Sequence, residues 1–522
     1  MAGPETQRLR GVVLTTLLGA GAFAVVLAST RSPLFDLDRY AVPKELALHL
    51  TALVGLMVLL PGWRWLEATV VEFLLGIYVI WSGMAALLGQ NHWLAFRGWS
   101  LTFASLVVFV MARAARRAGY GRVLVHLLAL AVTVAALGGL LQAYGVEWAI
   151  LQSDRPPGGT MGNRNFLAHL CVIGLPLAGF VAIDAPRRWL MGAGLSALGI
   201  LSWTILLTRS RAAWLAALLL LGTALMASWR LPAMGQRRRK RAAGLALVAG
   251  ALAALLLPNR LEWRANAPYR ESLTGLLNYQ GGSGRGRLIQ YANSLKLIGR
   301  NPVFGTGPGN WMVEYPRVTT SGDPSYAGAD PIPTNPWPSS DWVAIVTERG
   351  VIGTLLLVAA GLAAAVIAFR RRRHPEEGTA ALALVGLLIA AVVTGLFDAV
   401  IHLAPPAFIV FAGLGALLPD TGTVVTREVT GRRRVAAVGL PLLAAALATL
   451  YSGAQLAAIR LTEIGRQRTA MERAVQYDPG NHRLHLLLAM RGNCTQRLPH
   501  ARAAAELLPY HSYPRQIIRR CR

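Results

Sequence analysis

Charged residues are scarce in this 522-residue chain, and lysine and cysteine are nearly absent. Charged side chains make up 15% of the residues, whereas soluble domains usually carry about 25%. Hydrophobic residues account for 54%, and the mean hydropathy is +0.45. These values exclude an intrinsically disordered chain, which needs low hydrophobicity, and they argue against a soluble globular fold.

The cysteines and the basic residues limit the kinds of functional site that the sequence predicts. Cys171, Cys494 and Cys521 form neither a Cys-x-x-Cys pair nor a Cys/His spacing typical of zinc sites, so no metal or redox site is predicted. The 52 basic residues outnumber the 25 acidic ones, and only three of the basic residues are lysines. Because the basic residues lie between long apolar runs, the charge indicates membrane topology rather than nucleic-acid binding.

Apolar runs close to the length that crosses a bilayer recur along the whole chain. Thirteen spans are predicted, at about 11–29, 43–61, 66–88, 98–112, 123–144, 166–184, 189–207, 212–228, 242–257, 343–369, 379–397, 404–419 and 435–456. The first run lacks a small-residue cleavage site, so we expect a retained span rather than a signal peptide. The expected fold class is all-α: a polytopic membrane helix bundle with a large extracytoplasmic loop and a small helical C-terminal domain.

The loops between these spans predict an orientation. Most of the basic loop residues fall on one side, which the positive-inside rule places in the cytoplasm together with the N-terminus. The expected organisation is then spans 1–9 within 1–257, an extracytoplasmic loop domain at 258–342, spans 10–13 within 343–456, and an extracytoplasmic tail at 457–522.

The extracytoplasmic loop carries its own local signals. Residues 287–300 have helical periodicity, with Leu288, Tyr291, Leu295 and Ile298 able to share one face. The glycine-rich stretch 305–310 then breaks the chain. It superficially resembles a phosphate-binding loop, but no apolar strand precedes it and it contains a proline, so we reject that interpretation.

The tail is expected to fold as short helices. Ala474 followed by Pro479 matches the end of a tetratricopeptide-type repeat, and Ala504 with Pro509 repeats the pair. Residues 478–481 are typical of an interhelical turn. Two degenerate helical hairpins and an ordinary pair of amphipathic helices both fit this pattern.

Two short motifs place arginines at the predicted outer ends of spans. In Gly162-Asn163-Arg164-Asn165, Asn165 could cap the following helix, and Arg164 would bring a guanidinium to a helix N-terminus that favours anions. Anchoring to a lipid headgroup is the alternative for Arg164. Arg209 and Arg211 join two apolar runs almost without a loop, where arginine is costly unless it faces the bundle interior or a polar cavity. We favour diphosphate binding over snorkelling for this pair.

Further polar residues lie on the same predicted side. Arg285 and Arg287 begin the loop helix, where a solvated surface helix is the alternative to anion binding. Ser339, Ser340 and Asp341 lead into the tenth span, and the Asp341 carboxylate could accept a proton from a hydroxyl.

Two acidic residues, an arginine and a histidine complete the candidates. Glu348 and Arg349 lie one to two turns into the tenth span, where they could pair structurally or face a cavity. Asp398 and His402 fall at the next outer turn, and His402 could be a buried structural histidine or a base.

In this order, the motifs resemble the bacterial O-antigen ligase and polymerase family of membrane glycosyltransferases. The matching elements are residues 162–168 opening a span, 207–212 ending another, 301–310 within the long loop, and 348–353 within an aromatic-led span. The resemblance covers roughly residues 160–420. Tetratricopeptide-like tails occur on some members, which favours that interpretation of 457–522.

The resemblance implies a function. Members transfer a glycan from an undecaprenyl-diphosphate carrier to an acceptor hydroxyl, at the outer face of the bacterial inner membrane, without a cofactor, metal or nucleotide sugar. The acceptor would be a lipid, a growing glycan or a protein. The expected partners are therefore this lipid-linked donor, one such acceptor, membrane lipids and a protein bound through the tail, with no nucleic acid.

The resemblance also implies roles for individual residues. Arg211 and Arg287 would hold the diphosphate, with Arg209, Arg285 and Arg164 as lesser candidates. Asp341, predicted from its position and not from the resemblance, completes the expected catalytic residues. The remaining predicted substrate-binding residues are Asn163, Arg164, Asn165, Arg209, Arg285, Ser339, Ser340, Glu348, Asp398 and His402.

One departure from the family concerns the base. Members usually carry a histidine just before the asparagine and aromatic residue that open the span after the loop. Here that stretch reads Ser339-Ser340-Asp341-Trp342, and residues 258–342 contain no histidine. We therefore predict Asp341 as the base, ahead of His402.

Three other functions are alternatives to glycan transfer to an acceptor. A polymerase of lipid-linked repeat units is the alternative within the family. A transporter or flippase is the alternative from another class, although the chain shows no repeated halves. A scaffold is disfavoured because thirteen spans are excessive for an anchor.

The predicted orientation puts Cys494 and Cys521 in an oxidising compartment, where a disulfide would stabilise the small tail, with two free thiols as the alternative.

Overall fold

The structure of the chain is a computed structural model. The structure describes residues 4–32, 35, 37–60, 65–151, 153, 155–230, 237–263, 266–274, 282–319, 323, 336–374, 376–465 and 467–521.

The described residues are mainly helical. The helices of the bundle are α1 (Pro4–Leu27), α2 (Asp38–Leu59), α3 (Val70–Leu87), α4 (His92–Arg117), α5 (Gly121–Ala143), α6 (Arg164–Asp184), α7 (Arg188–Thr208), α8 (Arg211–Arg230), α9 (Arg237–Leu256), α13 (Asp341–Arg371), α14 (Gly378–Gly395), α15 (Ala404–Leu417) and α16 (Gly431–Ile464). The loop and tail contain α10 (Pro268–Thr274), α11 (Gly282–Arg300), α12 (Trp311–Glu314), α17 (Arg468–Tyr477), α18 (His482–Ala489), α19 (Cys494–Leu507) and α20 (Ser512–Arg520). Short 3-10 turns are η2 (Gly159–Met161) and η4 (Tyr315–Arg317), and two strands are β1 (Trp65–Ala68) and β2 (Val425–Glu428).

The all-α membrane bundle predicted from the sequence is confirmed. A bundle helix covers most of each of the thirteen apolar runs. Ten of the described helices are long and apolar enough to cross a membrane. The other three, α8, α9 and α15, fall short of that standard: the apolar parts of α8 and α15 are shorter, and α9 begins with five basic residues. The short strand β1 replaces helix at the start of the predicted span 66–88.

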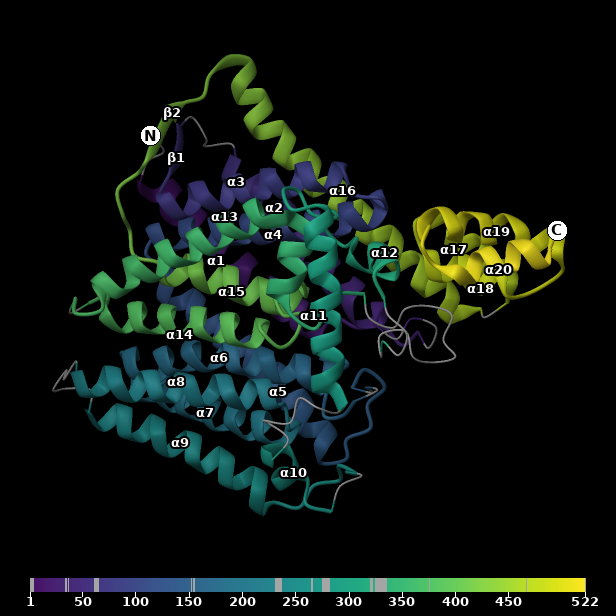
Figure 1. Ribbon diagram of the computed structural model, residues 1–522. Helices are drawn as coiled ribbons and strands as arrows, with labels where there is room; N and C mark the ends of the chain where they lie inside the picture. The colour runs from purple at the N-terminus through teal and green to yellow at the C-terminus, as the bar shows by residue number, and fades with distance from the viewer. Residues whose placement is uncertain are drawn as a thin grey trace.

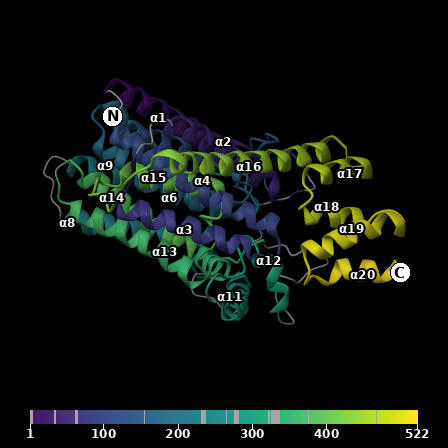
Figure 2. The ribbon, with the colours of Figure 1, turned by 90° about the horizontal axis from the view of Figure 1, so that it is seen from above.

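The bundle helices run side by side, and segments far apart in sequence pack together (Figure 1). Helix α15 packs on α4, α16 on α2, and α13 on α3. One large apolar core of leucine, valine, alanine and phenylalanine side chains extends through most of these helices. The two ends of the bundle differ, and Figure 2 shows the N-terminus at one end and helices α17 to α20 beyond the other.

The end that carries the N-terminus holds the two strands, and we call it the strand end. Strand β1 pairs with β2 in antiparallel fashion, with Trp65 opposite Glu428. Arg113 nearby is 1% exposed and donates to Asp420 at 2.8 Å. Arginines therefore tie the loops together at this end, where the positive-inside rule would place the cytoplasm.

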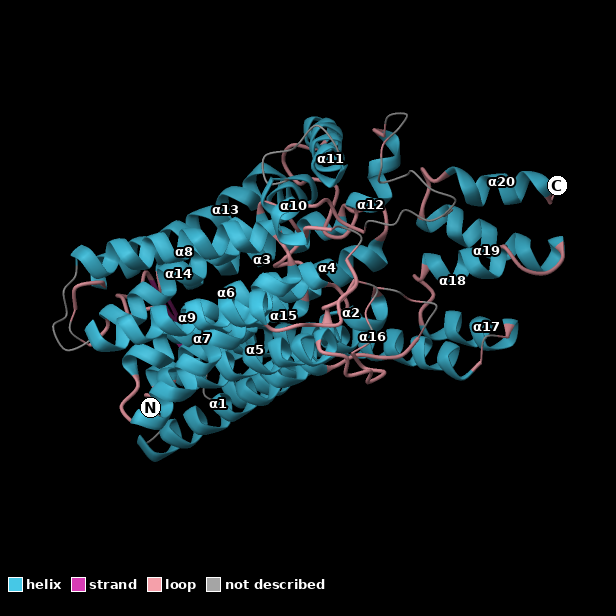
Figure 3. Cartoon of the chain, turned by 90° about the horizontal axis from the view of Figure 1, so that it is seen from below, coloured by secondary structure: helices cyan, strands magenta, loops and turns pink. Residues whose placement is uncertain are grey.

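The opposite end carries α11, α12 and the C-terminal helices, and we call it the tail end. Helix α11 runs across the ends of the bundle helices (Figures 1 and 3). The sequence predicted this helix but not its buried face. Leu288 and Leu295 are 50% and 65% exposed, whereas the polar side chains of Asn293 and Ser294 are buried.

The C-terminal helices pack on the loop. Leu486, Ala504 and Leu508 share a small core with Trp311 and other side chains of the loop. Helices α17 and α18 are joined by the predicted turn at 478–481, and Cys494 and Cys521 are disulfide-bonded, with their Cα atoms 5.2 Å apart. The tail thus gains apolar burial from the loop that a domain of this size could not provide alone.

Candidate functional site

The loop between α14 and α15 folds over the start of α13 and encloses one carboxylate. Asp341 is 1% exposed and accepts hydrogen bonds from the backbone N–H groups of Val400 and Ile401, at 2.9 and 3.0 Å. Its Oδ1 also lies 2.7 Å from Nδ1 of His402. Both oxygens are therefore occupied, and the carboxylate fixes the ring of His402 rather than facing an open mouth.

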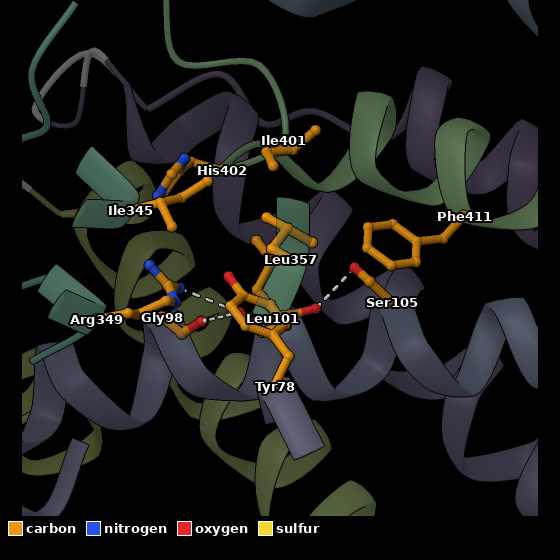
Figure 4. A pocket seen from close by; sticks show the side chains of 11 residues that line it. Tyr78, Gly98, Leu101, Ser105, Ile345, Arg349, Leu357, Ile401, His402 and Phe411 are labelled. Atoms are coloured by element: carbon orange, nitrogen blue, oxygen red, sulfur yellow. Dashed lines mark hydrogen bonds between the residues drawn. The ribbon is translucent and has the colours of Figure 1, made fainter. Parts of the chain in front are cut away.

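The second ring nitrogen of His402 points into the bundle. This Nε2 is buried, has no hydrogen-bond partner among the described residues, and lies 3.9 Å from Oε2 of Glu348. His402 lines a cavity of about 50 Å³ (Figure 4), with Arg349 near it and with Ser105 and Phe411 toward the other end. A volume of this size holds one or two water molecules or a hydroxyl group.

Glu348 and Arg349 form a buried ion pair beside this cavity. They are 1% and 3% exposed, and Nη1 of Arg349 lies 3.2 Å from Oε2 of Glu348. Arg349 also donates to Ser82 at 3.2 Å and to Thr102 at 3.1 Å. The sequence left open whether Glu348 and Arg349 pair structurally or face a cavity. In the structure they form an ion pair, and Arg349 also lines the cavity.

A break in α13 positions this pair. Gly350 has φ 69° and ψ −177°, a conformation that is essentially restricted to glycine. The break frees backbone groups, and the loop satisfies them: Thr306 N–H donates to Thr347 O at 2.8 Å, and Val351 N–H donates to Pro302 O at 2.8 Å. The glycine-rich stretch 301–310 is therefore a docking segment that completes a broken span.

Close packing explains the glycines of this segment. A Cβ atom on Gly350 would lie 1.9 Å from the carbonyl oxygen of Val303, and one on Gly305 would lie 2.4 Å from the backbone of Glu348. Asn310 is fully buried and bridges to Asn91, accepting from its N–H at 2.7 Å and donating to its carbonyl at 3.2 Å. The segment is thus fixed on both sides.

Two of the predicted arginines meet on one aromatic ring. The guanidinium groups of Arg164 and Arg209 lie 4.9 and 4.6 Å from the ring centroid of Trp263. Arg209 adopts φ 54° in the tight connection between α7 and α8, and its Nε donates to Ser272 at 2.9 Å. Bringing two cations together costs free energy through repulsion, which an anion bound between them would relieve.

A second group joins Arg287 to a carboxylate and a histidine. Burial raises the pKa of Asp398 to about 6, while the nearby charge of Arg287 opposes that rise. Asp398 Oδ2 lies 4.0 Å from Nδ1 of His169, a residue 1% exposed whose two ring nitrogens have no hydrogen-bond partner among the described residues. The positive charge of Arg155 interacts electrostatically with both Asp398 and Arg164. Arg155 therefore connects the group around Arg287 with the arginine pair on Trp263.

The remaining predicted residues have supporting positions. Asn163, not Asn165, caps α6, because its side chain accepts from the backbone N–H of Asn165 at 2.9 Å. Ser340 caps α13 and also donates to Gly395 O at 3.0 Å. The Ser339 carbonyl accepts from Tyr291 at 2.7 Å.

Two predicted arginines lie at helix starts. Arg211 begins α8 and is half-buried, and Arg285 is exposed near the start of α11. The geometry places Arg285 on the outer side of α11, so it contributes less to the enclosed site than Arg287.

Sequence reasoning missed Trp263, His169 and Arg155. Trp263 follows an irregular stretch with no helical or strand period. His169 lies five residues after Arg164 within an apolar span, and a charged or titratable side chain in such a span is itself a signal of function. Among the described residues, no three His, Cys, Asp or Glu side chains are grouped to hold a metal ion.

Comparison with known protein families gives a match over part of the chain. A family model described as O-antigen ligase matches residues 196–358, from α7 into α13. The match includes Arg209, Trp263, Arg287 and Asp341. Curated proteins give no match. Residues 196–358 therefore carry an O-antigen ligase domain, within a chain that has ten described helices long and apolar enough to cross a membrane.

Proposed function

We propose that the chain transfers a glycan from an undecaprenyl-diphosphate carrier to an acceptor hydroxyl at the tail end of the bundle. One observation carries this proposal: the oriented histidine, His402, lies on the loop between α14 and α15, and the charges of Arg287 and Arg155 act on Asp398 of the same loop. The carboxylate of Asp341 and the backbone of Asp398 connect them, since Asp341 N–H donates to Asp398 O at 3.1 Å. A base for the acceptor and cations for the leaving group are the two needs of such a reaction.

In this proposal the arginines hold the diphosphate. Arg164 and Arg209 on Trp263 form one pair of cations, and Arg287 approaches from α11, with Arg211 and Arg285 as outer contributors. Guanidinium groups suit phosphate oxygens because they donate two parallel hydrogen bonds. As the bond from the sugar carbon to the diphosphate oxygen breaks, the added negative charge on that oxygen is stabilised by these cations.

We assign the base to His402 and orientation to Asp341, which reverses the order expected from the sequence. Both Asp341 oxygens accept hydrogen bonds, so this carboxylate has little capacity left for an acceptor hydroxyl. His402 Nε2 is free to take the hydroxyl proton from the cavity side while Nδ1–H donates to Asp341. The deprotonated oxygen then attacks the anomeric carbon, and the diphosphate leaves with the bonding electron pair.

Orientation and location belong to the same proposal. We place the chain in a bacterial inner membrane, with the N-terminus and strand end in the cytoplasm and the loop 258–342, the tail and the site in the periplasm. The basic loops at the strand end support this orientation. The acceptor is a lipid, a glycan or a protein, and the tail offers a surface for a protein partner.

The test uses the purified full chain in lipid vesicles with an undecaprenyl-diphosphate-linked oligosaccharide. We expect free undecaprenyl diphosphate to appear in proportion to glycan attached to an added acceptor. Lengthening of the lipid-linked glycan would instead identify a polymerase. Movement of intact donor across the bilayer, with no bond broken, would contradict glycan transfer and support a transporter.

A further inference from the structure

We propose that α11 lies on the anionic outer surface of the membrane, with its exposed apolar stripe inserted among the lipid headgroups. This inference concerns a membrane contact and does not depend on the proposed glycan transfer. It rests on the exposure of side chains along α11, on the charges that flank them, and on the direction of the helix.

The amphipathic pattern of α11 is reversed relative to a helix packed on a protein core. Leu288, Ala292 and Leu295 are exposed at spacings of four and three residues, so they form one stripe along the helix. The side turned toward the rest of the protein instead buries Gln290, Asn293 and Ser294 along with Leu297. An exposed apolar stripe over a polar buried side is expected where the outer environment is itself apolar.

The charges around the stripe favour an anionic lipid surface. Arg285 precedes the stripe, Lys296 and Arg300 lie at its far end, and all three are exposed. The sequence of α11 contains no acidic residue. Cationic side chains flanking an apolar helix face are typical of helices that bind in the plane of an interface containing anionic lipids.

The direction and position of α11 agree with such a contact. The helix crosses the ends of the bundle helices (Figures 1 and 3), so it runs parallel to the plane of a membrane that these helices span. Tyr291 ties it to the bundle, since its hydroxyl donates to Ser339 O at 2.7 Å and also lies 3.1 Å from Leu396 O. These acceptors are at the outer ends of α13 and α14, which is the depth of the headgroups.

The inference also explains why Arg285 and Arg287 differ. Arg287 is near enough to act on Asp398 and His169, whereas Arg285 is exposed on the lipid-facing side. One helix would thus contact both the membrane surface and the enclosed site, and a lipid-borne substrate would meet its arginines at headgroup depth.

The test places a nitroxide label on cysteines introduced at single positions of the full chain in vesicles of phosphatidylethanolamine and phosphatidylglycerol. The positions are Leu288→Cys and Leu295→Cys in α11, Ile80→Cys as a lipid-facing reference that is 65% exposed in α3, and Gln476→Cys as an exposed reference in α17. The native Cys171 is buried, and Cys494 and Cys521 are bonded, so none of them competes for the label.

We expect the labels at Leu288 and Leu295 to resemble the Ile80 label, with an oxygen-to-nickel-chelate accessibility ratio several-fold above that at Gln476. Replacing phosphatidylglycerol with a neutral lipid should lower the ratio at the two α11 positions but not at Ile80. A ratio equal to that at Gln476 would show that the stripe faces water and would overturn the proposal. Low accessibility to both reagents would also overturn it, because a protein segment would then cover the stripe.

Discussion

His402 is oriented by the carboxylate of Asp341, which is itself held by two backbone N–H groups. Asp341 accepts from two backbone N–H groups and from the imidazole, so its position and charge are set by the loop between α14 and α15. This arrangement orients one nitrogen of His402 and leaves the other unpartnered in a cavity. At the scale of residues, the site therefore depends on few side chains, each held by a specific contact.

Trp263 should matter through the two guanidinium groups that it supports. Cation–π contacts contribute about 0.5–2 kcal/mol each, so Trp263→Ala should weaken donor affinity by about 2–30-fold if the equivalent of one contact is lost. Trp263→Phe keeps an aromatic face and should recover most of that loss. The measurement is the donor KM, with Trp189→Ala, an exposed tryptophan at the start of α7, as the matched control. Equal KM values for the wild type and Trp263→Ala would reject a role for this ring.

Asp398 should make donor binding depend on pH. Burial raises its pKa to about 6, so the carboxyl is neutral at pH 5 and negatively charged at pH 7. A negative charge among the arginines repels a diphosphate, and donor affinity should therefore fall as the pH rises through about 6. In Asp398→Asn this part of the pH dependence should disappear, and affinity at pH 7 should resemble that of the wild type at pH 5. Superimposable profiles of donor KM from pH 5 to 8 would contradict this account.

At the scale of elements, the site is built by a broken span and the loop that completes it. The carbonyls of Thr347 and Glu348 accept from Thr306 and Gly307 instead of from their own helix. A helix that is broken inside a membrane survives only where other groups satisfy its backbone. The loop 301–310 is thus part of the span, and the buried Glu348–Arg349 pair depends on its docking.

Gly350→Ala tests this dependence. A methyl group there would collide with the Val303 carbonyl and would force a conformation that costs about 1–3 kcal/mol outside glycine. We expect the variant to lose most transfer activity and to make the loop 301–310 sensitive to protease. Gly361→Ala, in the same helix with open space around the added methyl, should behave like the wild type. If both variants keep the loop protected, the docking contact is not needed.

The sequence predicts elements better than it predicts their faces. The apolar runs predicted the bundle helices because a span needs a continuous apolar stretch, whatever it packs against. The periodicity of 287–300 predicted α11 but gave no sign that its leucines face outward, because periodicity does not say what surrounds a helix. The strands β1 and β2 were missed because four residues carry too little pattern.

The site was predicted in part for the same reason. Arg164 and Arg209 stood out because arginine is costly at the end of a span. The pairing of Asp341 with His402 joins the start of α13 to a loop 61 positions later, and Trp263 contacts its arginines from a third segment. These contacts are formed by tertiary packing, which cannot be predicted from local sequence spacing.

At the scale of the whole molecule, contacts between loops occur at the two opposite ends of the helix bundle. The strand end joins β1 to β2, whereas the tail end holds Asp341, Asn310 and the C-terminal helices. The alternation predicted from basic loops assigns these ends to opposite sides of the membrane.

Labelling of cysteines in intact cells tests that assignment. Gln476→Cys in the tail should react with a membrane-impermeant maleimide, and Arg371→Cys at the strand end of α13 should react only after permeabilisation. The native Cys494 and Cys521 should label only after a reductant is added, because they are bonded. Labelling of Arg371→Cys but not of Gln476→Cys in intact cells would invert the orientation.

The most direct test of the account measures release of undecaprenyl diphosphate by the reconstituted chain and by two variants, His402→Ala and Asp341→Asn. If His402 removes the acceptor proton and Asp341 orients it, each variant should lower kcat by about 10²–10⁴-fold and leave the donor KM nearly unchanged. Glu506→Gln, an exposed change in the tail, serves as the control and should leave both constants unaltered. A His402→Ala protein that is folded and releases the carrier within a few-fold of the wild-type rate would contradict the central claim.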